Sequence, residues 1–189
     1  RRRDRMSRMN WVMAGALCGP RSLIHDVFGP TLRTAGMTLA PFNAWVVLKG
    51  LDTLALRAAQ QAQNAMTVGK YLEARVPRIL HPGLASHPQY DLAQRQMILP
   101  GSVFSFEVAG GRQAAHAILD ALELIDISNH FGDTKSLMCH PASTTHSSLS
   151  EEVRLDMGVT QGLLRISVGL EDPADLIEDL DQALRSAGI

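Results

Sequence analysis

Lysine, cysteine and aromatic residues are scarce in this chain of 189 residues, of which only 5% are aromatic. Lysine occurs only at positions 49, 70 and 135, although lysine and arginine together number 18, so most of the positive charge is carried by arginine. The two cysteines, Cys18 and Cys139, lie far apart and form no Cys-x-x-Cys pair. This spacing argues against a zinc knuckle, a redox dithiol or a disulfide scaffold, and it predicts a reducing, cytoplasmic environment.

Long apolar runs and a strong excess of one charge are also missing. The longest apolar stretches, such as residues 45–48, are far too short to cross a bilayer, so we expect no membrane partner. The formal net charge of -1 gives no basic field for nucleic acid. Residues 1–10 are rich in arginine and would be the only RNA-binding candidate, but an isolated charge run is usually solvated. We interpret them as an unmatched basic leader.

Apolar spacing predicts helices and short strands that alternate from residue 42 onward. Such alternation indicates an α/β or α+β fold, a small sheet layered with helices and preceded by a long helix. The clearest element is the last helix, with Asp172 as N-cap, Pro173 in its first turn and an apolar stripe behind them. We predict strands over 11–18, 76–80, 103–108, 124–127 and 162–169. We predict helices over 21–28, 42–75, 87–97 and 112–122, and two more that begin at residues 150 and 172. Loops are predicted over 29–41 and 128–148.

Arg165 is the most informative polar residue in the predicted strand 162–169. Leu164, Ile166 and Val168 share one face of this strand, so Arg165 and Ser167 share the other. A guanidinium fork on an inner strand is suited to a carboxylate, which would make Arg165 a substrate receptor. The alternative is an edge-strand arginine paired with Glu171 or solvated, and the residues alone favour that alternative.

The loop that follows the strand 124–127 contains the next candidates, Asn129 and His130. Loops at strand ends commonly carry binding groups, but Ser128, Asn129 and Asp133 are also typical of residues that satisfy turn backbone, and the residues alone slightly favour this second interpretation. His140 and His146 are six residues apart without a third ligand at suitable spacing, so we predict no metal site.

Several stretches in chain order resemble the Cys/Met-metabolism family of pyridoxal-phosphate (PLP) enzymes. They cover about residues 11–187 and are Leu32-Arg-Thr-Ala-Gly36, 41–54, His81-Pro-Gly-Leu-Ala-Ser-His-Pro88, Ser105-Phe-Glu107, Gly132-Asp-Thr-Lys-Ser-Leu137, His140-Pro-Ala-Ser-Thr-Thr-His146 and Gly162-Leu-Leu-Arg-Ile-Ser-Val-Gly-Leu-Glu-Asp172. The resemblance implies the α+β C-terminal domain of PLP-dependent transferase fold type I. It divides the chain into the leader 1–10, the end of the PLP-binding domain and inter-domain helix over 11–60, and a C-terminal substrate-binding domain over 61–189.

The resemblance also assigns roles to individual residues. In this family the arginine of the Leu-Arg-Ile-Ser-Val-Gly segment grips the substrate α-carboxylate, which implies that role for Arg165. The loop with Asn129 and His130 reaches toward the substrate, but relatives often carry Ser or Asn before a Leu-Gly-Asp step, whereas this chain has His130-Phe131. The Schiff-base lysine should fall within the first ten residues, near Asp4, where none is present, so no catalytic residue is assigned.

The implied activity is γ-replacement with PLP as the cofactor. Two segments are most similar to family members that make homocysteine from O-succinylhomoserine and sulfide. They are Pro41-Phe-Asn-Ala-Trp45 and Ile127-Ser-Asn129. Cystathionine γ-synthases, O-acetylhomoserine sulfhydrylases and methionine γ-lyases are alternatives. Expected partners are an acyl-homoserine substrate and, from the family, copies in a homotetramer or dimer. Without the lysine we expect the chain alone to be inactive, and a fragment or non-catalytic docking module is the alternative interpretation.

Overall fold

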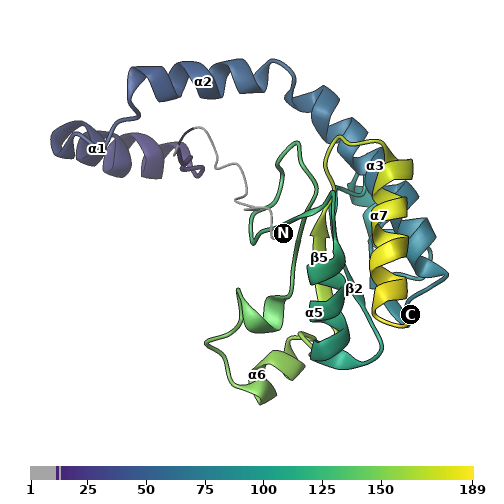
Figure 1. Ribbon diagram of the computed structural model, residues 1–189. Helices are drawn as coiled ribbons and strands as arrows, with labels where there is room; N and C mark the ends of the chain where they lie inside the picture. Colours follow the sequence, from purple (N-terminus) through teal and green to yellow (C-terminus); the bar gives the residue numbers. More distant parts are fainter. Residues whose placement is uncertain (1–11, 13) are drawn as a thin grey trace. The chain divides into compact units, whose positions relative to one another are not determined.

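The computed structural model describes residues 12 and 14–189 (Figure 1). The chain divides into two compact units, one that ends at Ala55 and one that comprises Leu56–Ile189. The predicted basic leader, residues 1–10, lies outside the described residues. The predicted domain boundaries after residues 10 and 60 stay a prediction.

The unit that ends at Ala55 contains three helical segments. These are the π-helix Leu23–Phe28, α1 (Gly29–Ala35) and α2 (Pro41–Leu51). Pro30 and Pro41 each stand in the first turn of an α-helix, where the missing N–H has no intrahelical partner to lose. The loop predicted over 29–41 is therefore wrong for residues 29–35, because Gly29-Pro30 begins a helix there instead of a turn.

The strand predicted over 11–18 is also wrong for the residues that the structure describes. Residue 12 and residues 14–20 have no regular secondary structure. A strand needs a neighbour to satisfy its backbone groups, and a short apolar run does not by itself provide one.

The long helix predicted over 42–75 is two helices, because the chain turns at Asp52-Thr53 between α2 and α3 (Leu54–Glu73). The break therefore lies at neither Gly50 nor Gly69, the two glycines within residues 42–75. Gly69 lies within α3, where an added Cβ would meet the His81 ring at 3.3 Å. Glycine at this position therefore allows α3 to lie close to the rest of its unit.

A mixed five-stranded sheet forms the centre of the second unit, in the order β1-β2-β5-β4-β3. Its strands are β1 (Arg78–Leu80), β2 (Val103–Glu107), β3 (Asp126–Ile127), β4 (Leu137–Cys139) and β5 (Leu163–Ser167). Only β3 and β4 pair in parallel, and the other neighbours are antiparallel. β4 falls in the predicted loop 128–148, which corrects that prediction: its three residues are all buried, so the strand shows no alternating pattern.

Helices cover one face of this sheet. They are α3, α5 (Gly111–Ala121) and α7 (Pro173–Ser186), and Figure 1 shows α5 and α7 side by side along the strands. α7 begins as predicted, since Asp172 Oδ1 accepts a hydrogen bond of 2.8 Å from the Ala174 N–H and Pro173 stands in the first turn. The core between helices and sheet includes Val68, Leu72, Phe104, Phe106, Ile118, Met138, Leu164, Ile166, Leu176 and Leu180.

Two short helices lie outside this layer, α4 (Tyr90–Gln96) and α6 (Glu151–Asp156). Ser150 caps α6 as predicted, because its side chain accepts from the Val153 N–H. Together the sheet and its helices confirm the predicted α/β class. None of the helices in the described part of the chain is both long and apolar enough to cross a membrane.

Candidate functional site

Arg165 lies at the middle of β5, the central strand of the sheet. Side chains at alternate positions of a strand point to opposite faces. Leu164 and Ile166 are both 0% exposed in the helix-covered core, so Arg165 points to the opposite face. The structure thus places the arginine on the face that the sequence predicts.

Small side chains flank Arg165 on both neighbouring strands. Ser105 of β2 and Cys139 of β4 are its direct cross-strand partners, so all three lie in one row on the same face. Burial raises the pKa of the Cys139 thiol, while the Arg165 guanidinium and the Thr144 hydroxyl act in the opposite direction. The net shift is upward, so Cys139 is a neutral, compact neighbour that leaves the guanidinium room to extend over the sheet.

The loop between β3 and β4 folds over this face and contacts the guanidinium. Arg165 Nη2 donates a hydrogen bond of 2.5 Å to the backbone carbonyl of Asn129. The Arg165 Cζ atom lies 5.8 Å from the centroid of the Phe131 ring. The Gly132 N–H donates to Ser167 Oγ at 3.0 Å, which ties the loop to the same strand two residues further along.

Hydrogen bonds at the end of the loop hold it against α3 and the segment after β5. Gln61 Nε2 donates to the Asp133 carbonyl at 2.5 Å. The Ser136 N–H donates to Glu171 Oε1 at 2.7 Å, and the Ser136 hydroxyl accepts from the Gly169 N–H at 2.8 Å. Glu171 is therefore bound to Ser136, which removes the alternative that pairs it with Arg165.

The guanidinium consequently has no carboxylate partner within ion-pair distance among residues 12 and 14–189. An arginine has five N–H donors, and the Asn129 carbonyl takes one of them. A partly exposed guanidinium with donors to spare can bind a carboxylate with two parallel hydrogen bonds. This is the chemistry that the arrangement offers to a ligand.

The two other predicted site residues differ in how they meet Arg165. Asn129 contacts it through the backbone, since its carbonyl and not its amide side chain accepts the hydrogen bond. His130 is exposed, and its backbone N–H donates to Ser128 Oγ at 3.2 Å. Ser128 and Asp133 satisfy turn backbone, as the simpler interpretation proposed. Sequence reasoning did not select Phe131, Ser105 or Cys139; only the alternation of β2 could have indicated Ser105.

The histidines of the segment after β4 hold loops together. His140 Nε2 donates to the Gln161 carbonyl at 2.9 Å, so its Nδ1 is free to accept from Ser143 Oγ at 2.6 Å. His116 on α5 joins them, with its Nε2 3.2 Å from His140 Nδ1. Burial lowers the pKa of His140, which favours this neutral form.

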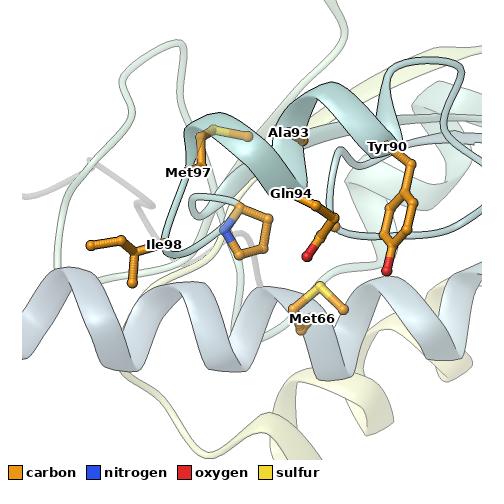
Figure 2. A pocket seen from close by; sticks show the side chains of 8 residues that line it. Met66, Tyr90, Ala93, Gln94, Met97 and Ile98 are labelled. Carbon is orange, nitrogen blue, oxygen red and sulfur yellow. The ribbon is translucent and has the colours of Figure 1, made fainter.

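A separate cavity of about 250 Å³ lies between α3 and α4 (Figure 2). It is lined by two thioethers and by polar groups from Tyr90 and Gln94, and Figure 2 shows Met66 and Gln94 directed into it. None of its lining residues belongs to β4, β5 or the loop 128–136. The cavity is thus distinct from the Arg165 site.

Fold and site together define an α/β domain whose central strand carries an arginine of a geometry suited to a carboxylate. The chain belongs to the Cys/Met metabolism PLP-dependent enzyme family, whose model matches residues 8–185. This confirms the resemblance found in the sequence.

Three relatives show how the match extends. An O-succinylhomoserine sulfhydrylase of Mycobacterium tuberculosis is 45% identical over 181 residues, which are 92% of this chain and 44% of the relative. An L-methionine gamma-lyase of Porphyromonas gingivalis is 40% identical over 178 residues, 93% of this chain and 45% of the relative. The crystal structure of a proposed O-acetylhomoserine (thiol)-lyase of Campylobacter jejuni, which carries pyridoxyl-lysine monophosphate, superimposes with a TM-score of 0.82 at 38% identity, over 89% of this chain and 41% of that one. The chain therefore spans less than half the length of the relatives it matches.

The residues of this chain fit the substrate side of such a site but not attachment of the cofactor. Lys49 is paired with Asp52 on the unit that ends at Ala55, and Lys135 Nζ lies 2.6 Å from the Asp126 carboxylate. The third lysine, Lys70, is exposed on α3, the helix that packs on the other face of the sheet from Arg165. Of the two lysines in the unit that contains Arg165, Lys135 is paired with Asp126 and Lys70 lies on the other face of the sheet, so we derive no chemical step through the cofactor.

Proposed function

We propose that this chain forms the substrate-carboxylate side of a PLP-dependent γ-replacement enzyme, with the Schiff-base lysine supplied by polypeptide outside residues 1–189. The reaction proposed for the whole enzyme converts O-succinylhomoserine and sulfide into homocysteine and succinate. The main support is Arg165, a guanidinium on the central strand that has no carboxylate partner among the described residues. The 45% identity to an O-succinylhomoserine sulfhydrylase supports the choice of substrate.

In this proposal Arg165 binds the substrate, and the polar groups around it orient the guanidinium or add contacts to the substrate. The guanidinium binds the α-carboxylate of the amino acid, and the Asn129 carbonyl orients Nη2 so that the other donors face the ligand. The Asn129 and His130 side chains, both exposed on the loop, complete the substrate contacts. All related activities act on amino acids that carry the same carboxylate, so Arg165 serves any of them, and the acyl group must be recognised elsewhere.

The binding role of Arg165 can be measured on the purified chain. We expect O-succinyl-L-homoserine, titrated by NMR, to perturb the Arg165 Nε–H signal. Arg165→Ala should weaken binding about tenfold or more, because a charge-assisted hydrogen bond contributes about 1.5–3 kcal/mol. Arg165→Lys should lose most of the affinity too, since a point charge cannot replace the planar fork.

Arg95→Ala is the matched control, because Arg95 is an exposed arginine on α4, outside the site. It should bind the ligand as the unaltered chain does. Wild-type affinity in Arg165→Ala, or no saturable binding by the unaltered chain, would contradict the proposed function.

A further inference from the structure

Phe131 is the point at which the loop over Arg165 departs from the family's usual Leu-Gly-Asp step, since this chain has Phe131-Gly-Asp. The Phe131 side chain is 68% exposed. A single exposed apolar residue is common and means little by itself. Its position against the Arg165 guanidinium is what distinguishes it.

The geometry of this contact is that of a cation–π interaction. The distance of 5.8 Å from Arg165 Cζ to the ring centroid lies within the range of about 6 Å over which the ring quadrupole attracts a cation. The carbonyl of Asn129, two residues before Phe131, accepts from Nη2 of the same guanidinium. One loop therefore supplies both a ring and an acceptor to one side chain.

The backbone that follows Phe131 is anchored to β5 and to α3. The Gly132 N–H, next to Phe131, donates to Ser167 Oγ, and the Asp133 carbonyl accepts from Gln61 of α3. Phe131 has only two side-chain torsions, whereas a free arginine loses about 2 kcal/mol of rotamer entropy when it is ordered. A ring carried by an anchored loop can order the guanidinium before any ligand arrives.

We infer that Phe131 is a positioning residue that stacks on the Arg165 guanidinium and holds its free N–H donors in the orientation that a substrate carboxylate requires. This inference rests on the proposed function of Arg165. It gives the residue that departs from the family pattern a physical role: an aromatic ring stabilises the receptor in the absence of substrate.

The test compares Phe131→Leu, which keeps an apolar side chain but removes the ring quadrupole, with Phe131→Tyr, which keeps an aromatic ring. Two quantities are measured on the purified chains: the 15N relaxation of Arg165 Nε–H without ligand, and the dissociation constant for O-succinyl-L-homoserine. Phe131→Leu should make the guanidinium more mobile and raise the dissociation constant about twofold to fivefold, the equivalent of 0.5–1 kcal/mol. Phe131→Tyr should retain both properties.

Phe42→Leu is the matched control, because Phe42 lies on α2 and is also 68% exposed. Circular dichroism confirms that each variant is folded. The inference is overturned if Phe131→Leu matches the unaltered chain in mobility and affinity, or if Phe131→Tyr behaves like Phe131→Leu. Neither result contradicts the proposed role of Arg165, because that role is tested separately by the affinity of Arg165→Ala. If Arg165→Ala still binds the ligand, the proposed function fails, and the relaxation measurements still test the contact between Phe131 and Arg165.

Discussion

Burial determines the chemistry of His81, which is 1% exposed although it is polar. Its Nδ1 accepts a hydrogen bond of 3.0 Å from the Gly83 N–H, and its ring centre lies 5.0 Å from that of Phe104. Nε2 has no hydrogen-bond partner among the described residues. Burial therefore lowers the pKa of His81 from 6.5 to about 4.

This pKa shift predicts loss of stability in mild acid. Between pH 6.5 and about 4 the unfolded chain binds a proton that the folded chain does not, so the free energy of unfolding falls as the pH is lowered through this window. The loss should reach about 3 kcal/mol by pH 4. His140, whose pKa burial also lowers, acts in the same direction.

Urea unfolding at a series of pH values measures this effect. His81→Leu removes the titrating group, so its stability should depend less on pH than that of the unaltered chain. His146→Gln, at a half-buried loop position, is the control and should keep the full dependence. Identical pH profiles for His81→Leu and the unaltered chain would show that His81 is not the group responsible.

At the scale of elements, Asp179 of α7 binds the segment that joins α5 to β3. Its carboxylate accepts the N–H groups of Glu123, Leu124 and Ile125 at 2.7, 2.9 and 2.9 Å. Asp179 is 6% exposed, so one buried side chain satisfies all three donors, of which the Ile125 N–H is itself buried. The contact fixes where the chain leaves α5 and enters the sheet.

Asp179→Ala should lower the free energy of unfolding by about 1–3 kcal/mol, because it leaves the buried N–H of Ile125 and two partly buried N–H groups without an acceptor. Asp179→Asn should be milder, since its amide oxygen replaces one of the two acceptors. Asp175→Asn on the exposed side of the same helix should change stability by less than about 0.5 kcal/mol. Chemical denaturation measures the free energy of unfolding of the three variants and of the unaltered chain. If Asp179→Ala is as stable as Asp175→Asn, Asp179 does not have the proposed structural role.

The elements that sequence reasoning predicted are those whose local signals agree with their packing. α7 carries its cap, its first-turn proline and its apolar stripe within fifteen residues, and β5 shows the alternation that sets the direction of Arg165. β4 and the irregular residues 14–18 were mispredicted because strand formation depends on a partner elsewhere in the sequence. The same holds for the site: Phe131 and Arg165 are 34 positions apart, so their contact leaves no pattern in either segment.

At the scale of the whole molecule, the chain corresponds to only part of the enzymes that it resembles. The chain contains the arginine that we propose as a carboxylate receptor, and it covers 44% of the Mycobacterium tuberculosis relative. In the unit that contains this arginine, Lys135 is paired with Asp126 and Lys70 lies on the other face of the sheet. The purified chain with added PLP should therefore form no homocysteine from O-succinylhomoserine and sulfide above the level without protein. Turnover that depends on the chain and disappears in Arg165→Ala would overturn this expectation.

The position of β5 at the centre of the sheet has a consequence for how the receptor arises. Hydrogen bonds to β2 and β4 hold this strand from both sides, and a shift by one residue would exchange the faces of Arg165 and Leu164. Such a slip would bury the Arg165 cation in the apolar core and expose Leu164. A register that is wrong by one residue is therefore strongly disfavoured. The guanidinium beneath the loop 128–136 and the apolar layer on the opposite face therefore both require this one register of β5.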